Sequence, residues 1–126
     1  MAARAERIPV SAKIEEEKDP GQIIYLFPGQ GVQKVGMGKT LYENSEIAQE
    51  IFDQLKIVKP ELLDIMLDDS SKDEPVNVFD DTSIAQPAIV AVGLATYFEF
   101  QKVNPSWQPL AYLGHSTGQI STLAAS

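Results

Sequence analysis

The sequence predicts an α/β fold in which short parallel strands are covered by helices. Residues 23–26 and 109–113 are apolar runs of strand length, and each is followed directly by a glycine-containing turn. Between them, apolar residues over 47–55 recur at intervals of three and four, as they do on the buried side of a surface helix. Strands separated by helical segments are typical of a parallel sheet with helices packed on its faces.

A second, shorter helix is expected directly after the one over residues 47–55. Pro60 suits the first position of such a helix, because the N–H group that proline lacks has no partner there. Residues 68–81 contain many acidic and polar side chains and no helical periodicity, so they are predicted to form a loop.

A longer helix is expected from Ser83 or Gln86 to about Lys102. Ser83 and Gln86 have the spacing of a capping box, and Pro87 is also compatible with the first turn of a helix. Residues 88–100 are apolar on nearly every side, which favours burial against the sheet. No segment is expected to be long and apolar enough to span a membrane.

The run over residues 113–118 places a serine on a turn between the second strand and a helix-like segment. Gly114 and Gly118 stand two residues before and two residues after Ser116. Glycines at these places allow the chain to reverse sharply while the serine hydroxyl projects outward. Strand, turn and helix follow one another in the order of a nucleophile elbow, and a plain turn that happens to contain a serine is the alternative.

A second glycine-containing loop follows the first strand. Residues 27–31 read Phe-Pro-Gly-Gln-Gly, a backbone that can approach a ligand closely and point main-chain N–H groups at it. An oxyanion hole requires such N–H donors. Taken alone, the loop also reads as a simple connection between two elements.

Together, these motifs resemble the malonyl-CoA:acyl carrier protein acyltransferase family, which includes the acyltransferase domains of fatty acid and polyketide synthases. Three signatures occur in the family's order: Phe-Pro-Gly-Gln-Gly at 27–31 followed by Gln33 and by Gly-Met-Gly at 36–38, then Gln-Pro-Ala at 86–88, and then Gly-His-Ser-x-Gly at 114–118. The resemblance implies that residues 22–126 are the amino-terminal part of an α/β-hydrolase-like acyltransferase core, with parallel strands, a nucleophile elbow and covering helices.

The resemblance also implies roles for individual residues. Ser116 would be the catalytic nucleophile that accepts an acyl group from coenzyme A, and the main-chain N–H groups of Gln30 and Thr117 would form the oxyanion hole. An acyl-enzyme of this kind gives ping-pong kinetics. The other motif and loop positions carried over from the family are Gly29, Gly31, Gly114, His115 and Gly118.

A catalytic base is missing from this assignment. The resemblance implies a histidine and an arginine farther along the chain, and the single histidine here, His115, adjoins Ser116. Side chains of adjacent residues diverge, so a structural role is favoured for His115 over a role as general base. Thr117 stands where the family usually has leucine or another larger residue, which leaves the acyl preference open. The isolated chain is therefore expected to be a truncated, inactive part of an acyltransferase.

Charge and composition limit the cofactors and partners. Between Glu43 and Asp81 there are twelve acidic residues and three lysines, and the whole chain has a net charge of −8, which should repel nucleic acid. With no cysteine and one histidine, no metal site is expected. The resemblance implies a coenzyme A thioester as substrate and no permanently bound cofactor. It implies acyl-CoA, an acyl carrier protein and the remainder of the acyltransferase domain as partners.

Residues 1–21 are predicted to be a flexible extension, because a basic stretch is followed there by a run of acids with no apolar periodicity. A cytoplasmic location is expected, with a mitochondrial one as the alternative. Two other functions stay open at this point: a serine hydrolase or thioesterase, since the same elbow serves esterases, and a non-catalytic truncated fragment.

Overall fold

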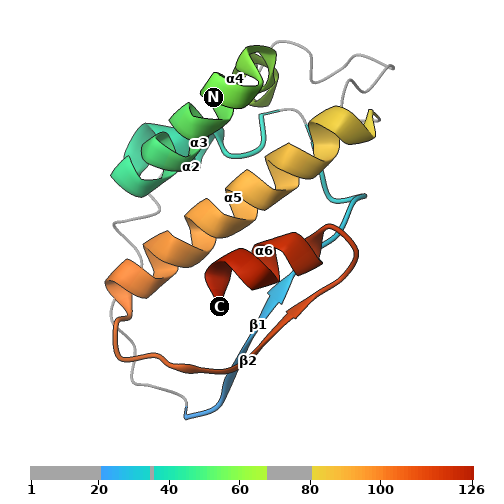
Figure 1. The fold of residues 1–126 in the computed structure, drawn as a ribbon. Helices are drawn as coiled ribbons and strands as arrows, with labels where there is room; N and C mark the ends of the chain where they lie inside the picture. Colours follow the sequence, from blue (N-terminus) through green and yellow to red (C-terminus); the bar gives the residue numbers. More distant parts are fainter. Residues whose placement is uncertain (1–20, 35, 68–80) are drawn as a thin grey trace, which may run out of the picture.

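The computed structural model describes residues 21–34, 36–67 and 81–126, so the predicted extension before residue 21 and most of the predicted loop over 68–81 lie outside the described residues. The long helix α5 crosses the middle of the fold, with helices α2, α3 and α4 on one side and the strands with helix α6 on the other (Figure 1). The elements in chain order are β1 (Ile23–Phe27), α2 (Lys39–Asn44), α3 (Glu46–Val58), α4 (Pro60–Leu67), α5 (Thr82–Val103), β2 (Pro109–Gly114) and α6 (Gly118–Ala125).

Strands β1 and β2 pair in parallel, which confirms the predicted mixed α/β class with parallel strands. Tyr25 lies opposite Tyr112, and Leu26 lies opposite Leu113. Phe27, the last residue of β1, is opposite Gly114, the last residue of β2. Because both strands run in the same direction, the loops that follow them leave the sheet at the same edge.

Helix α5 begins at Thr82, one residue before the earlier of the two predicted starts, and its N-cap is Asp81. The Asp81 carboxylate accepts a hydrogen bond from the Ser83 main-chain N–H at 2.8 Å. The prediction of a capping box on Ser83 was therefore wrong. Both residue types favour N-caps, and the aspartate two positions earlier satisfies the first free N–H groups of the helix.

Pro87 lies inside α5 rather than at its first position. Since proline has no N–H, the carbonyl of Ser83 four residues earlier loses its helical partner. The ammonium group of Lys59, at the end of α3, donates to that carbonyl oxygen at 2.9 Å and to the Ser83 hydroxyl at 3.0 Å. A side chain distant in sequence thus compensates for the interruption and joins α3 to the start of α5.

The largest group of fully buried side chains lies between helices α3, α4 and α5. Phe52, Leu62 and Met66 have no exposed surface, and Ala88, Ala91 and Ala95 of α5 pack on the same cluster. Small residues on α5 let the neighbouring helices approach closely. This cluster is the hydrophobic core of the described part of the chain.

Helix α5, with 22 residues, is itself long and apolar enough to cross a membrane by length and composition, because an 18-residue window within it has a mean hydropathy of 1.2. The prediction that no segment has these properties was wrong. The helix packs against α3 on one side and α6 on the other, and it carries a buried carboxylate, Glu99, that accepts a 2.6 Å hydrogen bond from the Ser45 hydroxyl. Within the described part of the fold, 33% of that apolar window is buried.

Candidate active site

Ser116 lies in the three-residue turn between strand β2 and helix α6. Its φ of 52° is the one positive value at a non-glycine position among residues 21–34, 36–67 and 81–126. The left-handed region costs an L-amino acid about 1–2 kcal/mol, so surrounding contacts must hold the residue there. Ser116 is exposed, and its backbone conformation is the kind of strained turn on which a nucleophilic serine is presented.

The two glycines that flank Ser116 sit where no side chain fits. A Cβ atom on Gly114 would overlap the main-chain carbonyl of Gly118, one turn farther on. A Cβ atom on Gly118 would overlap the carbonyl oxygen of Phe27 at the end of β1. The backbones of β1, β2 and α6 therefore meet at van der Waals distance around the turn, which explains both glycines physically.

The loop after β1 lies directly against this turn. A Cβ atom on Gly29 would be 2.6 Å from the His115 carbonyl oxygen and 3.2 Å from the Ser116 Cβ. The His115 N–H also donates to the Phe27 carbonyl at 3.3 Å. The structure thus brings together the two loops that the sequence analysis selected, although they are far apart in the chain.

Hydrogen bonds within and around the loop define its shape. Gly31, at φ 116°, donates its N–H to the Gln33 side-chain carbonyl oxygen at 2.6 Å. The Gln30 side-chain amide donates to the Thr82 hydroxyl at 3.3 Å, which connects the loop to the first residue of α5. Gln33 belongs to the family signature in the sequence, but nothing in the spacing of Gln33 or Thr82 indicates these two contacts.

Thr117 is the N-cap of helix α6 and is buried. Its hydroxyl has no hydrogen-bond partner among the described residues. At this end of α6 the Gly118, Gln119 and Ile120 N–H groups donate to the carbonyl oxygens of His115, Ser116 and Thr117 at 2.9, 3.0 and 3.0 Å, and the helix dipole favours negative charge there. The structure therefore places the predicted oxyanion donor Thr117 at a helix N-terminus beside Ser116, and Gln30 directly after the glycine that touches Ser116.

His115 is exposed, and its ring nitrogen Nδ1 lies beside Gly29, 3.0 Å from where a Cβ on that glycine would be. Its main chain connects the turn to both the β1 loop and helix α6, since its carbonyl accepts from the Gly118 N–H at 2.9 Å. Within the described part of the chain, no side chain hydrogen-bonds to the Ser116 hydroxyl.

A cluster of tyrosines lies between the strands and α5, away from Ser116. The Tyr97 and Tyr112 hydroxyls share a 2.9 Å hydrogen bond, and the Tyr25 ring stacks on the Tyr112 ring. Burial, together with the hydrogen bond to Tyr112, raises the pKa of Tyr97 well above its usual value. The raised pKa keeps the Tyr97 hydroxyl protonated at neutral pH, which favours a structural role for the hydrogen bond that it shares with Tyr112.

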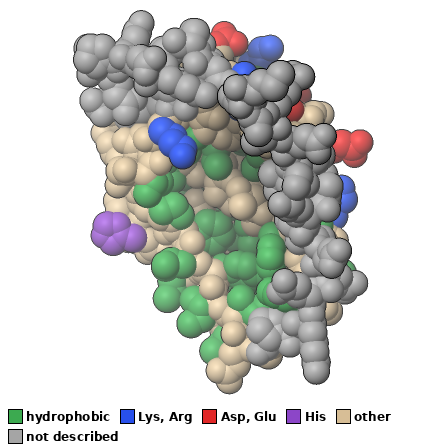
Figure 2. All heavy atoms as spheres, turned by 180° about the vertical axis from the view of Figure 1, so that it is seen from behind, with side chains coloured by type: hydrophobic (Ala, Val, Ile, Leu, Met, Phe, Trp, Pro, Cys, Tyr) green, Lys and Arg blue, Asp and Glu red, His purple; other side chains and the backbone are tan. Residues whose placement is uncertain are grey.

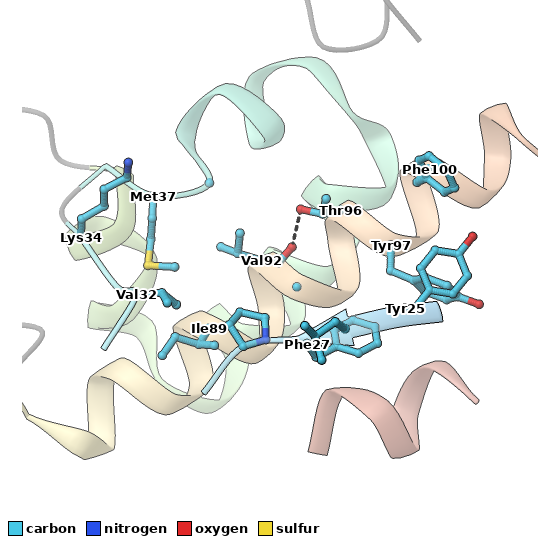
Figure 3. A pocket seen from close by; sticks show the side chains of 14 residues that line it. Tyr25, Phe27, Val32, Lys34, Met37, Ile89, Val92, Thr96, Tyr97 and Phe100 are labelled. Atoms are coloured by element: carbon cyan, nitrogen blue, oxygen red, sulfur yellow. Dashed lines mark hydrogen bonds between the residues drawn. The ribbon is translucent and has the colours of Figure 1, made fainter. Parts of the chain in front are cut away.

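A cavity of about 590 Å³ opens between β1, the segment that follows it and α5 (Figure 3). Its walls are mainly apolar, with Lys34 and Met37 toward one end and Tyr25 and Phe100 toward the other. Ser116 does not line it. The cavity therefore lies behind the β1 loop rather than over the serine.

Comparison with known proteins places the sequence in a family. The sequence matches the acyl transferase domain family over residues 24–126. The chain belongs to that family. The acyl transferase domain described here is 32% identical over 106 residues to the malonyl CoA-acyl carrier protein transacylase of Bacillus subtilis, which covers 82% of this chain and 31% of that protein.

Other relatives show the same pattern. The transacylase of the same name from Staphylococcus aureus is 33% identical over 101 residues, which is 79% of this chain and 30% of that protein. The orsellinic acid synthase of Armillaria mellea is 34% identical over 122 residues, 88% of this chain and 5% of that synthase. The chain thus spans about a third of the length of the transacylases and a small part of the synthase.

Proposed function

We propose that this chain supplies the nucleophile and the oxyanion hole of an acyltransferase. The enzyme would move a malonyl or related acyl group from coenzyme A to the phosphopantetheine thiol of an acyl carrier protein in fatty acid or polyketide synthesis. One observation supports this most directly: an exposed serine with φ of 52° stands between a parallel strand and a helix, in contact with a proline-glycine loop. The names of the transacylase relatives support the choice of acyl donor and acceptor.

The chemistry proceeds in two displacements. The Ser116 oxygen attacks the thioester carbonyl carbon, the hydroxyl proton passes to a base, and the coenzyme A thiol leaves to give an acyl-serine ester. The carrier-protein thiol then attacks that ester, and the serine recovers its proton. In both steps the negative oxygen of the tetrahedral intermediate would accept hydrogen bonds from the main-chain N–H groups of Gln30 and Thr117. Removing one such donor typically lowers kcat by about 10²–10³-fold.

The base and the groups that bind the acyl carboxylate would come from the remainder of the acyltransferase domain, which is the first partner of this chain in the proposal. His115 is adjacent to Ser116 and its main chain builds the turn, so we assign it a structural role. The chain alone would then be inactive. We further propose a cytoplasmic location, a coenzyme A thioester as substrate rather than a resident cofactor, and no metal or nucleic acid.

The test is acylation by malonyl-CoA, followed by intact-mass measurement. The chain alone should gain no appreciable acyl adduct. A hybrid in which the chain replaces the matching segment of the Bacillus subtilis transacylase should be acylated rapidly, and Ser116→Ala in the same hybrid should abolish the adduct. A cooperative thermal transition in both hybrids is the control for folding.

Adding an acyl carrier protein separates the proposal from a serine hydrolase or thioesterase. Transfer of the acyl group to the carrier thiol supports the transferase, whereas release of free acid without transfer supports the hydrolase. An adduct that survives Ser116→Ala contradicts the proposed nucleophile. A folded hybrid that is never acylated favours a non-catalytic fragment.

A further inference from the structure

The apolar cavity lies along one edge of strand β1. It touches the consecutive residues 25–28, whereas strand β2, all of whose residues are described, contributes nothing to its walls. Successive strand residues point to opposite faces, so a groove that touches all of them runs along an edge. That edge is the one away from β2, and the groove along it is named the edge groove here. Its far wall is a stripe of α5 at helical spacing (Figure 3): Ile89, Val92, Gly93, Thr96, Tyr97 and Phe100.

Main-chain polar groups of β1 face this groove. The Phe27 carbonyl accepts a hydrogen bond from the His115 N–H at 3.3 Å, so the polar groups of Phe27 point toward β2. In a parallel strand the N–H and C=O of one residue point to the same edge, and successive residues alternate between the two edges. The N–H and C=O of Leu26 therefore point away from β2. Among the described residues, they have no hydrogen-bond partner outside the sheet.

An edge of this kind favours the addition of a strand. Free N–H and C=O groups along a strand are a template for pairing, and a neighbouring apolar groove selects the side chains of the incoming segment. Two strands alone form a marginal sheet, and parallel sheets are normally larger and covered. The Leu26 side chain is itself 73% exposed. One added strand would pair with the Leu26 main chain and cover the α5 stripe.

We propose that the edge groove accepts an apolar strand from the remainder of the acyltransferase domain, which gives the sheet the order added strand, β1, β2. The matched segment is 31% of the Bacillus subtilis transacylase, so most of that enzyme's length lies outside it and can supply the strand. A second copy of this chain is disfavoured as the occupant, because each copy has a net charge of −8. The identity of the occupant rests on the proposed function, whereas the groove does not.

The experiment compares hydrogen exchange of single amides, followed by NMR, in the 126-residue chain and in the hybrid with the Bacillus subtilis transacylase. The Leu26 amide should exchange roughly tenfold or more slowly in the hybrid than in the chain alone, because it gains an acceptor there. The Phe27 amide, which faces β2, is the internal control and should be protected in both proteins.

A charge placed in the groove provides the second test. Thr96 is exposed on α5 and lines the groove, so Thr96→Lys should leave the urea midpoint of the chain alone nearly unchanged. In the hybrid it should remove the added protection of Leu26 or prevent folding, because the ammonium group would be buried against the added strand. Thr40→Lys is the matched control at an exposed threonine of α2 that does not line the groove, and it should leave Leu26 protected.

The proposal is overturned if Leu26 exchanges equally fast in the two proteins, or if Thr96→Lys leaves its protection in the hybrid intact. Protection of Leu26 in the chain alone that rises with protein concentration would assign the groove to a second copy instead. A hybrid without a cooperative thermal transition would also contradict the proposal, since the groove would not accept the rest of the transacylase. A hybrid that protects Leu26 but is never acylated contradicts only the proposed function, and an acylated hybrid with fast Leu26 exchange contradicts only the groove.

Discussion

Phe52, Leu62 and Met66 in helices α3 and α4 have no exposed surface, whereas Leu26 on β1 is 73% exposed and Leu123 on α6 is 79% exposed. The helical part of the chain therefore encloses most of its apolar side chains, with Ile57 and Val58 at the end of α3 as exposed exceptions, while the strand part, made of β1, β2 and α6, leaves many of its own open. Figure 2 shows hydrophobic side chains gathered on one face of the molecule, with the single histidine at its edge.

The candidate site belongs to the strand part. Its geometry depends less on side-chain burial than on main-chain contacts: Gly29 against the His115 carbonyl, and Gly118 against the Phe27 carbonyl. Backbone atoms in van der Waals contact cannot be repacked in the way that side chains can. A strained serine can thus be held in a region whose apolar surface is only partly covered.

The largest effect is expected from truncating a core side chain in the helical part. Leu62→Ala should lower the free energy of unfolding by about 2–5 kcal/mol, because it leaves a cavity among fully buried neighbours. The same change at the open face, Leu26→Ala, should stay within about 0.5 kcal/mol. Urea unfolding followed by circular dichroism measures both. If Leu26→Ala lowered the free energy of unfolding as much as Leu62→Ala does, the strand face would be covered in solution.

A somewhat smaller loss is expected at the main-chain contact between α6 and β1. The Cβ of Gly118→Ala would overlap the Phe27 carbonyl and lie 2.9 Å from that of Pro28, so we expect about 3 kcal/mol of destabilisation. Gly93→Ala is the matched control in α5, because its Cβ would lie 3.5 Å from the Phe27 ring in ordinary contact.

Gly93→Ala replaces a glycine in the interior of helix α5, so it should raise the free energy of unfolding by about 0.5–1 kcal/mol. Thermal melts of the two variants side by side test the contrast. A stable Gly118→Ala protein would mean that α6 is not seated on β1 as described.

The strain at Ser116 should appear as a difference between two substitutions that both remove its hydroxyl. Ser116→Gly permits a φ of 52° freely, whereas Ser116→Ala does not. We therefore expect the glycine variant to be more stable than the alanine variant by about 1 kcal/mol, measured by urea midpoints. The opposite order would indicate that the turn is relaxed.

The smallest effect concerns the N-cap of α5. The hydrogen bonds from Ser83 hold the pKa of the Asp81 carboxyl below its usual range. A carboxyl with a lowered pKa in the folded state adds stability at pH values above its unfolded pKa, about 3.9, and that stability is lost as the pH falls through the folded value. Asp81→Asn retains a capping oxygen without the charge.

The Asp81 carboxylate stabilises the wild type only while it is charged, and Asp81→Asn has no such charge to lose. The urea midpoints of the two proteins should therefore converge as the pH falls below about 4. Parallel pH profiles for the two proteins would contradict the cap.

Much of the fold was predictable because the chain carries local patterns. Apolar runs predicted β1 and β2 within one residue at each end, and periodicity with Pro60 predicted α3 and α4. The motifs around Phe27 and Ser116 indicated the acyl transferase domain family, which the family comparison confirms. Glycine spacing also singled out positions where the structure leaves no space for a Cβ.

Contacts between distant segments decided the rest. The start of α5 depends on competition between Asp81 and Ser83 for the same free N–H groups, and the ammonium of Lys59 reaches the carbonyl that Pro87 leaves unpaired. Hydropathy alone could not distinguish the central helix α5 from a membrane span, since both are apolar on most sides.

The amino-acid sequence by itself determined which residues are strand, helix and tight turn, because those choices depend on neighbours a few positions away. Only the tertiary structure decided that the Gly29 loop touches Ser116, that Ser116 adopts a positive φ, and that Gln33 holds the Gly31 amide. These features arise when parallel pairing of β1 with β2 brings two strand ends to one edge of the sheet, and no local pattern specifies which backbone atoms then meet.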